Sequence, residues 1–194
     1  MFCRPAAFAL IVLFLNSCAQ HPVELPPGQV RIAPDVVMTL PKPSELGQSF
    51  EVAQLVTAHY GDRTFAFEGH LSATPDRFLL VGLDPMGHRA LSITWTNETI
   101  LTEKESWVPE QLRPANILAD MVMLYWPEES LRRALSGSGG ALRSAPRERT
   151  VSAGGKDVIR AEQPADGDDP WNGKATFSNM AWGYRLDIQS ERLQ

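Results

Sequence analysis

The sequence predicts an α+β fold in which two helices accompany a curved antiparallel sheet. Segments that alternate apolar and polar residues occur on both sides of a central stretch with helical period. The chain has 194 residues, of which 43% are hydrophobic and 21% charged, as is typical of one globular domain. Its net charge of -5 offers no basic surface for nucleic acid, so we expect no nucleic-acid partner.

The first residues have the composition of a secretory signal. Pro5 to Leu15 is an uninterrupted apolar run, too short to cross the roughly 30 Å bilayer core as a helix. The following Leu15-Asn16-Ser17-Cys18 resembles the bacterial lipobox. That resemblance implies that residues 1–17 are a lipoprotein signal peptide and that Cys18 carries a diacylglycerol and an N-acyl lipid. An ordinary secretory signal that contains a cysteine is the alternative.

Residue 19 is Ala, whereas the same resemblance implies an Asp there in lipoproteins of the inner membrane. We therefore expect a lipid anchor in the outer membrane, on its periplasmic face. Residues 18–43 are rich in proline and have no sustained period, which predicts a lipidated, extended tether. The folded domain is then expected over residues 44–194.

The folded part begins with strands of period two. In the segment 63–73, Phe65, Phe67 and Leu71 share one face, and turn residues such as Gly61-Asp62 separate neighbouring segments. This pattern predicts a meander of hairpins. The expected strands are 49–60, 63–73, 77–83, 89–96 and 99–104, followed after the helices by 147–153, 157–163, 174–179 and 183–189.

The middle of the chain predicts two helices between the fifth and sixth of these strands. Apolar residues from Pro114 to Tyr125 recur at i, i+4 and i+7, which is typical of an amphipathic helix. A second helix is expected over 127–136, followed by a flexible break at 137–140. We expect both helices to pack on one face of the sheet or across one end.

No motif for catalysis or metal binding is visible. The histidines occur singly, without metal-ligand spacing, at His21, His59, His70 and His88. The acidic run 166–169 lacks the spaced ligands of a calcium loop. We therefore expect no enzyme activity, no metal and no cofactor besides the lipid on Cys18. A hydrolase with a spatially assembled site is an alternative, and its first sign would be His59 or His70 facing a serine.

Many apolar residues fall on the predicted inward faces, and two interpretations of them are open. They fill a core, or a bent sheet partly closed by the helices leaves an apolar hollow for an acyl chain. The candidate lining residues are Phe65, Phe67, Leu91, Ile93, Trp95, Met121, Leu124, Trp126, Trp182 and Tyr184.

Two resemblances add to this pattern. The segments 54–58, 74–77, 81–89, 117–120, 125–127 and 183–186 resemble a bacterial lipoprotein family of unknown function. That family is encoded beside genes for aryl-polyene and fatty-acid-type biosynthesis. The resemblance extends over roughly residues 44–190 and implies no established mechanism.

The architecture is also similar to LolB, an outer-membrane lipoprotein that receives lipoproteins from a periplasmic carrier. Asp84-Pro85-Met86-Gly87 stands where LolB has an Asn-Pro-Leu-Gly turn whose Leu contacts the membrane, so Met86 is a candidate membrane or cargo contact. A Met folded back onto the sheet is the alternative. The segment 127–132 with Gly137 matches a LolB helix, but Ala134 replaces a LolB Trp. This similarity implies an incomplete, LolB-like β-barrel whose opening the helices cover.

Together these features predict a monomeric outer-membrane lipoprotein that binds an acyl chain, lipoprotein or polyene-type lipid and delivers it to the membrane. Its expected partners are the outer membrane, the cargo and a LolA-like periplasmic carrier. The alternative is a structural or complex-tethering lipoprotein with a filled core and no ligand.

Overall fold

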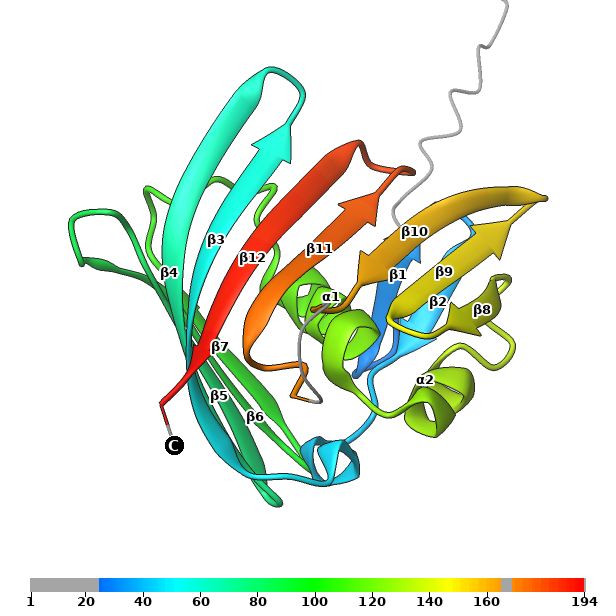
Figure 1. Cartoon of the computed structure of the whole chain (residues 1–194), viewed down its shortest axis with the longest axis horizontal. Coiled ribbons are helices and arrows are strands. Elements are labelled where there is room, and N and C mark those ends of the chain that lie inside the picture. The colour runs from blue at the N-terminus through cyan, green and yellow to red at the C-terminus, as the bar shows by residue number, and fades with distance from the viewer. Residues whose placement is uncertain (1–24, 165–168, 194) are drawn as a thin grey trace, which may run out of the picture.

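The computed structural model describes residues 25–164 and 169–193 (Figure 1). The predicted signal peptide, Cys18 and His21 lie outside these residues. The strands are β1 Gln29–Ala33, β2 Val36–Thr39, β3 Phe50–Tyr60, β4 Arg63–Thr74, β5 Arg77–Leu83, β6 Arg89–Thr96, β7 Ile100–Lys104, β8 Ala141–Ala145, β9 Glu148–Ala153, β10 Lys156–Glu162, β11 Gly173–Asn179 and β12 Tyr184–Arg192. The helices are a 3-10 turn, Pro43–Leu46, and the α-helices α1 Pro114–Tyr125 and α2 Glu128–Ala134.

Most of the chain forms one antiparallel sheet, whose strands differ in length. Its strand order is β7-β6-β5-β4-β3-β12-β11-β10-β9-β8, so β3 at the start of the meander pairs with the last strand, β12. Among the described residues the two edge strands, β7 and β8, do not pair with each other, and the sheet stays open. Figure 1 shows the sheet curving around α1. The predicted curved antiparallel sheet with two helices between its strands is thus present.

Helix α1 lies on the concave side of the sheet and is buried nearly all round. Every residue from Leu118 to Tyr125 is buried, including Asp120. The prediction of an amphipathic helix is therefore wrong for its C-terminal two turns. The sheet encloses one side of α1, and the β1–β2 hairpin covers another (Figure 1), so no stripe of these turns meets solvent.

The prediction that residues 18–43 form an extended tether is wrong from Gln29 onward. Val30, Ile32, Val36 and Met38 alternate along the β1–β2 hairpin and are 5% exposed or less. Their burial in the main core outweighs the prolines around them, and the turn at Pro34-Asp35 joins the two strands. The folded domain therefore begins well before residue 44.

The predicted flexible break at 137–140 is instead a close packing point. A Cβ on Gly139 would lie 2.3 Å from the carbonyl oxygen of Asp35, and one on Gly140 would lie 2.8 Å from Val151 Cγ1. The backbone N–H of Val37 also donates to the carbonyl of Ser138 at 3.1 Å. These glycines let the hairpin dock directly against the chain that leads into β8, a strand that the sequence analysis missed.

Candidate functional site

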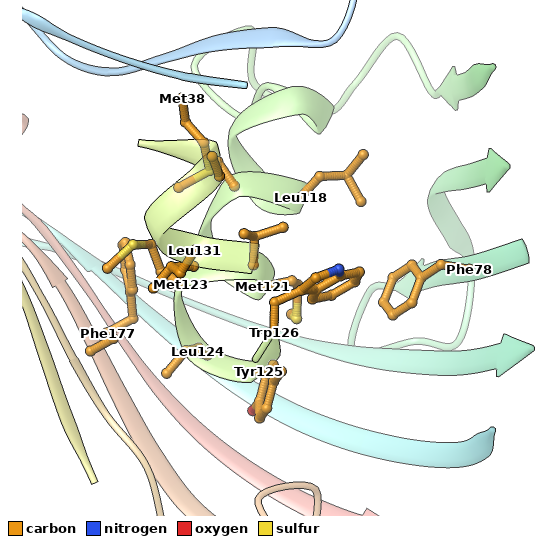
Figure 2. Packing of buried hydrophobic residues seen from close by; sticks show 14 of the residues in the cluster. Met38, Phe78, Leu118, Met121, Met123, Leu124, Tyr125, Trp126, Leu131 and Phe177 are labelled. Atoms are coloured by element: carbon orange, nitrogen blue, oxygen red, sulfur yellow. The ribbon is translucent and has the colours of Figure 1, made fainter. Parts of the chain in front are cut away.

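The interior beneath α1 is filled with side chains. Figure 2 shows large apolar groups around α1, with Met38 on one side and Phe78 and Phe177 on others, while Tyr125 belongs to α1 itself. Trp95 stacks on Trp126 with ring centroids 5.1 Å apart. This packing places apolar rings where the hollow was expected.

Six of the predicted lining residues are core residues instead. A cavity that admits water leaves part of its lining side chains accessible. These six residues are at most 5% exposed, so they do not line such a cavity. They are Leu91, Ile93, Trp95, Met121, Leu124 and Trp126. The correction has a physical cause, since two indoles and the α1 side chains together occupy the volume that the sheet encloses.

An open apolar surface lies nearby, where the β3–β4 hairpin projects beyond the end of β5 (Figure 1). The last β4 residue paired with β5 is Glu68, opposite Leu83, so residues 63–67 extend past the end of β5. On the concave side this extension carries Ala58, Tyr60, Phe65 and Phe67, here called the inner apolar face.

The inner apolar face is exposed although it continues the core. Tyr60 is 52% and Phe65 44% exposed, while Ala58 and Phe67 are partly buried. The same strand faces carry fully buried residues such as Val52 and Leu71 further along. Exposure begins where β5 ends, because β4 continues past Glu68 without β5 beside it.

β12 extends this surface with Tyr184 and Leu186, which pair with Tyr60 and Ala58. Both are partly buried against the core. The Tyr184 hydroxyl lies 2.9 and 3.0 Å from the carboxylate oxygens of Asp120 on α1. Burial raises the pKa of Asp120 well above its ordinary value, despite this hydrogen bond, and burial and the nearby carboxylate raise the pKa of Tyr184. The pair thus ties α1 to the sheet beside the open surface.

A second polar cluster lies deeper, on β3. Gln54 Nε2 donates to the hydroxyl oxygens of Tyr125 at 3.0 Å and Ser190 at 2.9 Å. Burial raises the pKa of Tyr125 to about 12. Tyr125 also stacks on Trp171, with centroids 3.9 Å apart. This cluster fixes the register of α1 against β3 and β12.

Met86 lies at the tip of the β5–β6 turn and is 79% exposed, so it does not fold back onto the sheet. The Asp84 carboxylate accepts the backbone N–H groups of Met86 and His88, both at 2.8 Å. These bonds and the His88 ring lower the pKa of Asp84. The turn thus holds Met86 outward.

Trp107, which the sequence analysis did not select, is 55% exposed near the same end of the sheet. It follows Glu105, whose N–H donates to the carbonyl of Ala90 at the start of β6. Trp182, a predicted lining residue, lies in the β11–β12 turn and is partly buried. Its backbone N–H donates to Asn179 Oδ1 at 3.0 Å.

The described histidines lie outside this surface, each beside a carboxylate. His59 Nε2 lies 3.1 Å from Asp187, His70 lies 2.7 Å from Glu68, and His88 lies 3.1 Å from Asp84. Each of these three histidines is thus hydrogen-bonded to a carboxylate. His59 also meets Thr64 Oγ1 at 3.3 Å, but on the outer face of the sheet, where both His59 and Asp187 are about two-fifths exposed. Among the described residues, neither His59 nor His70 is hydrogen-bonded to a serine.

No group of three or more His, Cys, Asp or Glu side chains in the described part of the chain is placed to hold a metal ion. Within residues 25–164 and 169–193, no helix combines the length and apolar composition needed to cross a bilayer.

Comparison with curated proteins finds no match. Among solved structures, a LolA superfamily protein from Nitrosomonas europaea aligns with a TM-score of 0.45 and 9% sequence identity, over 76% of this chain and 86% of that one. A likeness at this level says nothing about function. A family model described as a protein of unknown function, DUF3261, matches residues 51–192, and the chain therefore belongs to the DUF3261 family.

Proposed function

We propose that this protein is an outer-membrane lipoprotein that holds an acyl chain on its inner apolar face and helps to pass it to the membrane. The cargo would be a lipid, an acylated protein or a polyene-type lipid. The observation that carries the proposal is the exposure of Tyr60 and Phe65 on the concave side of the sheet, in continuity with the core.

The energetics suit a reversible carrier. Apolar surface removed from water contributes about 25 cal/mol per Å², and each CH₂ about 0.8 kcal/mol. An acyl chain laid along Ala58, Phe65 and Phe67 would gain part of this free energy, and the bilayer would supply the rest. Because the two environments are similar, transfer needs proximity and no covalent chemistry. We accordingly propose a role without enzyme activity.

Met86 and Trp107 support a membrane contact close to this surface. A flexible thioether and an indole are side chains that enter the interface between water and lipid readily. With both exposed near the end of the sheet from which the β3–β4 hairpin projects, a chain leaving the inner apolar face would meet the bilayer there. The lipid on Cys18 would hold a monomer near the membrane, and a LolA-like carrier would supply the cargo.

One observation favours the alternative of a structural or tethering lipoprotein. The volume beneath α1 is packed with rings, so a ligand has only the open face to bind. In that case the exposed residues of the β3–β4 hairpin would contact another protein.

The test is a titration of a fluorescent fatty acid into the full chain carrying Cys18→Ser, which prevents lipidation. We expect saturable binding that Phe65→Ser weakens about fivefold, the loss expected for roughly half a phenyl side chain. Leu55→Ser is the matched control, because Leu55 is 57% exposed on the outer face of the same hairpin. Equal loss in both variants, or no binding by the parent protein, would contradict the proposal.

A further inference from the structure

A depression of about 510 Å³ lies on the outer face of the sheet, over β10, β11 and β12. Its volume falls within the roughly 300–1,000 Å³ typical of small-ligand sites. It is here called the outer depression. Its lining residues are Asp157, Arg160, Glu162, Thr176, Ser178, Met180 and Arg185.

The strand register arranges these side chains in two rows across the sheet. Arg160 pairs with Ser178, and Ser178 pairs with Arg185, which makes a cationic row. Two residues along β11, about 7 Å away, Thr176 lies between Glu162 and Asp187, which makes an acidic row. Of these two acids Glu162 lines the depression, whereas Asp187 binds Arg185 and His59.

The floor of the outer depression is formed by short polar side chains. Ser178 and Thr176 are short, whereas the side chains on β10 and β12 are long, so β11 forms the base between two walls. Phe177 and Asn179 point to the buried side, which places the two hydroxyls on the outer face. Each hydroxyl can donate and accept a hydrogen bond.

The cationic row retains binding capacity. Arg185 gives Nε and one terminal nitrogen to Asp187, at 3.0 and 2.6 Å, and its side chain is 57% exposed. Arg160 lies 3.8 Å from Asp157, beyond hydrogen-bond distance, and is 44% exposed. Asp157 is itself bound by Ser152 at 2.6 Å and Arg143 at 3.3 Å. Two guanidinium groups flanking a hydroxyl suit a phosphate.

Met180 places an apolar side chain at one end of the outer depression, beyond the cationic row. It follows β11, its N–H donates to the carbonyl of Val158 at 2.9 Å, and it is 46% exposed. Along β11 the order is therefore apolar at Met180, cationic beside Ser178 and acidic beside Thr176. The other lining carboxylate, Asp157, is engaged by Ser152 and Arg143. A zwitterionic phospholipid has the same order, because its phosphate lies between the acyl-bearing glycerol and the ammonium group.

We infer that the outer depression binds a phosphoethanolamine group, with the phosphate on Arg160 and Arg185 and the ammonium on Glu162. The glycerol attached to this phosphate would lie over Met180. Tyr60 pairs with Tyr184, so the β11–β12 turn lies at the same end of the sheet as the β3–β4 tip. The depression therefore opens toward the end that carries the inner apolar face.

The test measures binding of glycerophosphoethanolamine, a soluble headgroup, to the full Cys18→Ser chain by isothermal titration calorimetry. We expect saturable binding at millimolar or lower concentration, at least fivefold tighter than that of glycerol 3-phosphate, which lacks the ammonium. Arg160→Gln should weaken both ligands at least fivefold. Glu162→Gln should remove the preference for the zwitterion. Arg143→Gln is the matched control, because Arg143 also binds Asp157 but does not line the depression.

The absence of saturable binding, equal affinity for the two ligands, or equal loss in Arg143→Gln and Arg160→Gln would overturn the inference. Vesicles with and without phosphatidylethanolamine distinguish a membrane lipid from the free headgroup as the source. Phe65→Ser should leave headgroup binding unchanged, so failure at the inner apolar face and failure at the outer depression are distinguishable.

Discussion

At the scale of single residues, Asp120 is a carboxyl group held in the core by one tyrosine hydroxyl. Burial disfavours its charged form and raises its pKa well above 3.8, its ordinary value. At pH values between the pKa of Asp120 in the unfolded state and its higher pKa in the folded state, the folded state binds more protons than the unfolded state. The stability that this group contributes is therefore present at low pH and is lost as the pH rises through the folded pKa.

Asp120→Asn should remove this loss, because Asn stays neutral and still accepts the Tyr184 hydroxyl. We expect the free energy of unfolding at pH 8 to rise by at least about 1 kcal/mol relative to the parent protein. Urea denaturation from pH 5 to pH 8 measures it. Tyr184→Phe should act in the opposite sense and lower the free energy of unfolding at pH 8, since the carboxylate loses its donor and its pKa rises further. A pH dependence that persists in Asp120→Asn would assign the effect to another group.

Met86, which is 79% exposed, is the residue that we propose enters the membrane. Met86→Glu should lower the fraction of the Cys18→Ser chain that floats with lipid vesicles by at least about fivefold, since a charged group enters the apolar layer poorly. Its free energy of unfolding should change by less than about 0.5 kcal/mol. Leu101→Glu is the control, because Leu101 is 65% exposed on the edge strand β7, away from the turn. Equal flotation of parent and Met86→Glu would exclude insertion of the tip.

The residues of the candidate site could be assigned to a face of the sheet from sequence, but their exposure could not. Period-two alternation places Phe65 and Phe67 on the concave side. Whether they are covered depends on where β5 ends relative to β4, which is a property of the pairing and not of either strand. For the same reason Tyr60, at a strand end beside a turn, carries no sequence signal of its own.

At the scale of elements, the strands of the meander and α1 follow from local patterns. The spacing of turn residues such as Gly61-Asp62 sets the hairpins, and Pro114 begins α1 as predicted. The β1–β2 hairpin was missed because the prolines around it suggested a tether. Val30, Ile32, Val36 and Met38 around Pro34-Asp35 do form a short hairpin pattern that could have identified it.

β8 could not be predicted in this way. It is only five residues long, and none of them is buried. Its place in the sheet comes from pairing with β9, and the chain before it is fixed by the glycines that contact the β1–β2 hairpin.

Gly139→Ala tests the docking of the hairpin. The new Cβ would meet the Asp35 carbonyl, and the backbone at φ +85° already disfavours a side chain, so we expect a loss of roughly 2 kcal/mol or more in urea denaturation. Gly137→Ala has a similar φ of +69° with no atom within 4 Å, and should cost only about 1 kcal/mol. Equal losses would show that the close contact with Asp35 adds nothing.

At the scale of the whole molecule, the open sheet carries two different surfaces at one end. The concave side is apolar where the β3–β4 hairpin projects, and the convex side carries rows of opposite charge over β10, β11 and β12. The Met86 turn and Trp107 lie near that end. This arrangement suits a protein that meets lipid from one end while its packed core stays unchanged.

The most direct measurement of the central claim is photo-cross-linking with a fatty acid that carries a diazirine on its chain, followed by peptide mapping of the full Cys18→Ser chain. We predict labels within residues 58–67 and at Tyr184 or Leu186, suppressed by an excess of unlabelled fatty acid. Labelling confined to the outer face, for example at Leu55 or Leu101, or labelling that excess fatty acid does not suppress, would contradict binding at the inner apolar face.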